Sequence, residues 1–120
     1  MLALPLLLAI AFVVYAEGTP TPFAIWNALP MVASFALLRA NRRARLANRI
    51  GAVIFAATAT LFETLFHLAW RLDWHRTATE SSTSALAFIF VPIWACLLAA
   101  AGGVLAWGIP WLVDRNRTAR

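Results

Sequence analysis

The chain has 120 residues, of which 62% are hydrophobic and 12% are charged, and its mean hydropathy is +0.77. Soluble domains are usually about 45–50% apolar with about 25% charged residues, and a small soluble fold has too much surface to bury so much apolar area. The composition therefore excludes an ordinary soluble domain and predicts an integral membrane protein.

The net charge of +5 is a property shared with nucleic-acid-binding proteins, but the placement of the charge argues against that class. All ten basic residues are arginines, and eight of them lie in two short stretches at the ends of apolar runs. A nucleic-acid-binding module needs a soluble scaffold, and the apolar runs leave none. We therefore predict a lipid bilayer, and no nucleic acid, as the surroundings of this chain.

Apolar segments divide the chain into predicted membrane spans, because a spanning helix needs about 20 apolar residues. Short polar stretches separate them, and the first of these contains Pro20 and Pro22, which cannot continue a helix. We predict an all-α fold, an integral membrane antiparallel four-helix bundle formed by a single domain over residues 1–120. Its expected spans are 1–16, 23–40, 50–70 and 85–109.

The first segment, 1–16, is short, and a cleaved signal peptide is the alternative to a retained helix. Signal peptides begin with a positively charged region, which this segment lacks. We therefore expect a retained first helix. In the second segment, Pro30 frees the carbonyl of Trp26, and Asn27 is placed to satisfy part of that break.

Five arginines lie together at the end of the second segment and in the loop after it, with no acidic residue among them. Together with the C-terminal tail, they assign the side of the membrane on which both termini lie. Cytoplasmic loops of membrane proteins carry an excess of positive charge. The C-terminal tail is also basic, whereas the other two loops have no positive excess. Four spans then place the arginine loop and both termini in the cytoplasm, in a bacterial inner membrane. The arginines are Arg39, Arg42, Arg43, Arg45 and Arg49.

Two interpretations of the arginine loop remain open. The simpler is orientation of the protein plus contact with anionic lipid headgroups, at about 1 kcal/mol per basic residue. The alternative is docking of an acidic cytoplasmic partner. We prefer the first because it requires nothing further.

The third segment contains Glu63, an acid within an apolar run, and His67 one turn later on the same helix face. Ionisable residues in the membrane usually face the bundle interior and are functional candidates. The pair is a candidate proton or ion site; the alternative is a hydrogen bond that fixes helix packing, and the charge of Glu63 stays open. The face predicted to point inward consists of Ala56, Ala59, Thr60, Glu63, His67, Trp70 and Trp74.

Metal or haem binding is a weaker interpretation of the same region. Imidazole and carboxylate groups are suitable ligands for zinc or iron. However, the spacing of His67, Asp73, His75 and Glu80 matches no metal motif. His67 and His75 are eight residues apart and would not naturally flank one haem. We predict neither a metal nor another cofactor.

The fourth segment carries a stripe of small residues, which allow helix backbones to approach closely. The sequence leaves open whether this stripe is a seam within one chain or a contact between chains. The predicted packing residues are Ala95, Ala99, Gly102 and Gly103.

The stretch Ser81–Trp94 has a polar patch followed by Ala-Leu-x-Phe-x-Phe-x-Pro and an aromatic residue. It resembles a segment of small, uncharacterised four-span bacterial inner-membrane proteins. The resemblance covers this segment alone and implies no function. The chain does not resemble the small multidrug exporters of similar size. Those proteins carry an essential Glu within the first helix, whereas no acidic residue precedes Glu17 here.

These patterns predict a small multi-pass inner-membrane protein that acts by association, as an accessory subunit of a membrane-protein partner or as a homo-oligomer. The alternative is a minimal proton- or cation-coupled transporter or channel centred on Glu63 and His67. We do not expect an enzyme, because the chain offers no set of acid, base and nucleophile beyond that pair.

Overall fold

The computed structural model describes residues 3–17, 22–79 and 84–118 of the chain. Within these ranges the chain is helical and contains no strand, which confirms the all-α prediction there. Glu80, Ser81, the two residues that follow Ser81, and Arg120 lie outside the described residues. The elements are α1 (Ala3–Glu17), α2 (Pro22–Ala40), α3 (Leu46–Arg71), η1 (Trp74–Arg76), η2 (Ser84–Leu86) and α4 (Ala87–Thr118), where η marks a short 3₁₀-helix.

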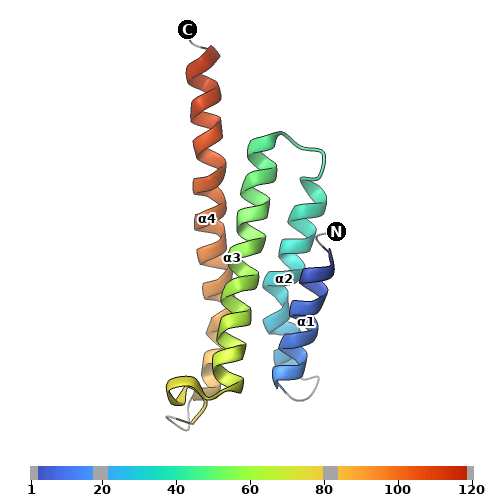
Figure 1. Cartoon of the computed structure of the whole chain (residues 1–120), viewed down its shortest axis with the longest axis vertical. Helices are drawn as coiled ribbons and strands as arrows, with labels where there is room; N and C mark the ends of the chain where they lie inside the picture. The colour runs from blue at the N-terminus through green and yellow to red at the C-terminus, as the bar shows by residue number, and fades with distance from the viewer. Residues whose placement is uncertain (1–2, 18–21, 80–83, 119–120) are drawn as a thin grey trace.

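The four α-helices lie side by side in an elongated body of 60 × 26 × 20 Å (Figure 1). The most extensive packing is between α3 and α4, and α2 contacts all three other helices. The α2–α3 connection lies at the end of the body from which α4 projects, and the α3–α4 connection lies at the opposite end (Figure 1). This arrangement places the arginine-rich loop and the last turns of α4 at one end.

Three helices are long and apolar enough to cross a membrane: 22–40, 46–71 and 87–112. By contrast, α1 has 15 residues, which at 1.5 Å per residue gives about 22 Å, less than the roughly 30 Å of a hydrocarbon core. It packs against α2 and α3, and its first turn lies below the level at which α2 ends (Figure 1). Of the four predicted spans, the first is thus the one whose helix is shorter than the hydrocarbon core of a membrane.

Two helices extend beyond the boundaries that hydropathy predicts. α3 begins at Leu46, four residues before the apolar run, and α4 continues to Thr118 instead of ending near 109. Hydropathy marks only the apolar part of a helix, whereas Leu, Ala and Arg are all good helix formers. The last turns of α4 project beyond the other three helices (Figure 1).

Many small side chains lie in the interior, together with larger ones such as Val13 and Met31, and large apolar side chains cover much of the outside. Ala59, Ala95 and Ala99 are fully buried, whereas Ile25 is 73% exposed and Leu105 is 70% exposed. A soluble domain does not leave so many large apolar side chains in contact with water. The distribution is typical of helices that pack through small residues and present large ones to lipid.

Candidate functional site

Glu63 and His67 lie inside the helix bundle, and both side chains are fully buried. The Nδ1 atom of His67 lies 2.8 Å from the backbone carbonyl oxygen of Glu63 and 3.5 Å from Oε2 of its carboxyl group. The imidazole therefore faces the preceding turn of its own helix. Glu63 is eight residues before the end of α3, which places it about 12 Å along the helix from that end.

Aromatic rings from two helices surround His67. Its ring centroid lies 5.5 Å from that of Phe66 on α3 and 5.5 Å from that of Phe88 on α4. Phe88 also packs edge-on against Trp70, at 4.6 Å between centroids. These rings fill the space beside the imidazole and fix its orientation against α4.

The inward face that the sequence predicts for the third segment is largely present. Ala56, Ala59, Glu63 and His67 are buried on α3, as the helical periodicity predicts. The exception is Trp74, which is 58% exposed and lies in η1. The prediction fails there because α3 ends at Arg71 and Asp73 adopts a left-handed backbone conformation, so the helical periodicity stops.

Polar groups on α2 are also buried, although the sequence analysis mentions only one of them. Asn27 and Ser34 are both 0% exposed. The Nδ2 atom of Asn27 donates to the carbonyl oxygen of Phe23, and the hydroxyl of Ser34 donates to that of Pro30. The hydrogen bond of Asn27 thus reaches the carbonyl of Phe23, one turn earlier on the same helix.

The small-residue stripe of the fourth segment lies within the bundle, and its two glycines approach α3. Ala95, Ala99 and Gly103 are buried, and Gly102 is partly buried beside Ile54 and Thr58 of α3. Gly103 lies against Gly51 of α3: a Cβ atom on either glycine would lie 3.0 Å from the carbonyl oxygen of the other. Gly51 is not predictable as a packing residue from the sequence, because its position marks it only as a small residue near the start of a helix.

An apolar groove of about 350 Å³ lies on the surface beside α1 and is called here the α1–α3 groove. Its α3 wall carries small and hydroxyl-bearing residues, and Leu6 and Leu38 close it from α1 and α2. The hydroxyl oxygen of Thr60 is buried at this wall and has no hydrogen-bond partner among the described residues. The α3 residues of the groove are Val53, Ala56, Ala57, Thr60, Leu61 and Thr64.

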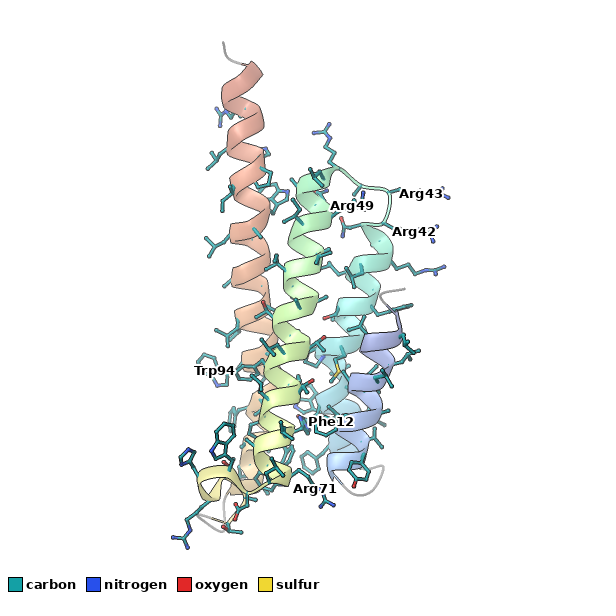
Figure 2. The ribbon with its side chains drawn as sticks, viewed as in Figure 1. Phe12, Arg42, Arg43, Arg49, Arg71 and Trp94 are labelled. Atoms are coloured by element: carbon teal, nitrogen blue, oxygen red, sulfur yellow. The ribbon has the colours of Figure 1, made fainter. Side chains whose placement is uncertain are left out.

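The five arginines of the loop are all exposed and lie at one end of the molecule, where Figure 2 labels Arg42, Arg43 and Arg49. Arg71 lies at the opposite end, with its guanidinium carbon 5.5 Å from the centre of the Tyr15 ring. The loop arginines do not all line one surface feature. Arg43 and Arg45 line a groove against α4, whereas Arg39, Arg42 and Arg49 lie outside it.

The two histidines do not come together. His67 is buried in the bundle, whereas His75 is exposed and stacks on Trp74. Over the described ranges, no three His, Cys, Asp or Glu side chains are grouped so that they could hold a metal ion.

Comparison with known proteins adds no relative. The chain matches no protein-family model, no curated protein and no solved structure.

Proposed function

We propose that this protein is a small multi-pass inner-membrane protein of a bacterium that acts by association within the membrane, as an accessory subunit or a homo-oligomer. The observation that carries the proposal is the α1–α3 groove. Because α1 is shorter than a span, a strip of α3 that includes Ala57, Thr60 and Thr64 stays open to the surrounding medium. Small and hydroxyl-bearing residues are the ones through which membrane helices associate.

In this proposal the helices form an antiparallel bundle in the bilayer, with the arginine loop in the cytoplasm. This topology is supported by the position of the two basic stretches, which lie at the same end of the molecule. Arg43 and Arg45 of the loop and Arg115 of α4 line the same groove, as a positive-inside topology requires when two spans, α3 and α4, lie between the two basic stretches. An odd number of spans between them would place these stretches on opposite sides of the membrane. A reporter active only outside the cytoplasm and fused after Arg120 should be silent, and activity there would contradict this topology.

Association can be tested by filling the α1–α3 groove. Ala57 is exposed in the groove, and Ala57→Phe would keep a second helix from approaching α3. We expect energy transfer between two differently labelled copies in proteoliposomes, or stoichiometric co-purification of one fixed partner, to be lost in this variant. Ala101→Phe is the matched control, because Ala101 is exposed on α4 and does not line the groove. Absence of both kinds of association in the wild type would refute the proposal.

A second candidate function is proton- or cation-coupled transport, and the burial of Glu63 with His67 favours it. A carboxyl group and an imidazole 3.5 Å apart inside a membrane helix can exchange a proton without exposing a charge to lipid. Proton flux into proteoliposomes should then be present in the wild type and lost in both Glu63→Gln and His67→Ala. Leu65→Ala, an exposed position on the same helix, should keep the flux. A wild type without flux would remove this candidate.

A further inference from the structure

The fold joins two basic stretches that are far apart in the sequence. Arg43 and Arg45, from the α2–α3 loop, and Arg115, from the projecting part of α4, line one groove of about 990 Å³, called here the arginine groove. No acidic side chain is among the described residues that line it. Three positive charges therefore surround one space at the end of the bundle.

One wall of the arginine groove is an ordered series of side chains on α4. Trp107 and Trp111 stack with ring centroids 6.0 Å apart, and the guanidinium carbon of Arg115 lies 5.4 Å from the centre of the Trp111 ring. The indole Nε1 of Trp107 donates to Oδ1 of Asn48 on α3, at 2.8 Å. This series fixes the position of Arg115 relative to the loop.

The opposite wall is the loop and the first turn of α3. Arg45 is the N-cap residue of α3 and makes no side-chain capping hydrogen bond. The next three residues, 46–48, line the groove as well. The partial positive charge of the helix end adds to the charge of the arginines.

An apolar groove adjoins the arginine groove on the bundle. It has a volume of about 330 Å³, is lined by residues of α2, α3 and α4, and shares Asn48 and Trp107 with the arginine groove. The Trp107–Asn48 hydrogen bond thus lies at the boundary of a basic space and an apolar one. A ligand that fits both has a negatively charged head and a hydrocarbon chain.

We infer that the arginine groove binds an anionic phospholipid, with its phosphate between Arg43, Arg45 and Arg115 and one acyl chain in the adjoining apolar groove. Arginine pairs with phosphate oxygens through two N–H groups at once, and basic pockets beside membrane helices bind anionic headgroups. Tryptophan is suited to the level of the headgroups, because its ring is apolar and its N–H is polar. The inference rests on the proposed membrane embedding and assigns it a lipid class.

The test is lipid binding by the full-length protein in a neutral detergent, measured by native mass spectrometry. Diacyl phosphatidylglycerol is the probe, and phosphatidylcholine is the neutral comparison. We expect the wild type to prefer phosphatidylglycerol by about tenfold or more. The triple variant Arg43→Gln, Arg45→Gln, Arg115→Gln should lose that preference.

A matched control removes the same charge outside the arginine groove, through Arg39→Gln, Arg42→Gln and Arg49→Gln. We expect it to keep the affinity for phosphatidylglycerol within about threefold of the wild type. Equal losses in the two triple variants would overturn the inference, because they would show that only the total positive charge matters. If the groove variant loses its helical circular dichroism, Arg115→Gln and Arg115→Lys replace it: the first should weaken binding more than the second, and equal binding by both would also overturn the inference.

Two further probes separate other sources of negative charge. Inorganic phosphate and glycerol 3-phosphate should not displace the lipid, because they cannot occupy the apolar groove, and displacement at equal concentration would overturn the lipid assignment. An acidic peptide that binds the groove more tightly than phosphatidylglycerol would overturn it as well. Failure of the membrane proposal is distinguishable, because the protein would then stay dispersed and helical without detergent.

Discussion

Gly51 on α3 and Gly103 on α4 form a reciprocal, close backbone contact between the two helices. A Cβ atom placed on either residue would lie 3.0 Å from the carbonyl oxygen of the other. The same atom on Gly51 would meet Cβ of Trp107 at 3.1 Å, and on Gly103 it would meet Cβ of Phe55 at 3.3 Å. Backbone atoms cannot move aside without shifting a helix, so this contact sets the distance between α3 and α4.

Gly103→Ala should therefore destabilise the protein. Overpacking of a tight contact costs about 1–3 kcal/mol, which should appear as a lower midpoint of denaturation in detergent. Gly108→Ala is the matched control on the same helix, because a Cβ there meets nothing within 4 Å. Alanine is a better helix former than glycine by about 0.5–1 kcal/mol, so the control should match or exceed the wild type. A Gly103→Ala midpoint equal to that of Gly108→Ala would contradict the tight contact.

His67→Ala should destabilise the protein by removing a ring from a filled interior. The imidazole packs on Phe66 and Phe88, and its loss would leave a cavity between α3 and α4. Emptying a site of this kind costs about 2–5 kcal/mol, measurable by the same denaturation. The neighbouring Leu68 is 37% exposed, so Leu68→Ala is expected to cost less, within about 1 kcal/mol. Similar losses in the two variants would count against the packed environment of His67.

The sequence predicts the helices and the buried face of α3 well, because both follow from the periodicity of residues close together in the chain. Ala56, Ala59, Glu63 and His67 repeat at helical spacing and are buried together. The pairing of Gly51 with Gly103 depends instead on how α3 and α4 align, which a single sequence does not specify. The same holds for Arg115: the sequence assigns lipid contact to the loop arginines alone, and only the fold places Arg115 beside Arg43 and Arg45.

The loop after α3 carries backbone strain, which glycine should relieve. Arg76 has φ of 64°, a left-handed conformation that costs an L-residue about 1–2 kcal/mol. Arg76→Gly should raise the denaturation midpoint slightly, by up to about 1 kcal/mol, since glycine also makes the unfolded chain more flexible. Thr77 is right-handed, with φ of −53°, so Thr77→Gly should lower the midpoint. The same direction of change in both variants would argue against the left-handed turn.

The carboxyl group of Asp73 organises the same loop and should make its order depend on pH. It accepts hydrogen bonds from the backbone N–H of Ala78 at 2.9 Å and of Thr79 at 3.2 Å, and from the Thr79 hydroxyl at 2.7 Å. The hydrogen bond from the Thr79 hydroxyl is the main cause that holds the pKa of Asp73 below its ordinary value of 3.8.

Because the pKa of Asp73 is lower in the folded loop than in the unfolded chain, its contribution to stability is fully present above pH 3.8. It is lost as the pH falls through the lowered pKa, when the protonated carboxyl group accepts these bonds poorly. The amide chemical shift of Ala78, followed by NMR in detergent, should titrate with a midpoint below 3.8. In Asp73→Asn the side-chain oxygen still accepts from the two backbone N–H groups but does not titrate, so that transition should disappear. A midpoint above 3.8 in the wild type would show that the carboxyl group is not held by these donors.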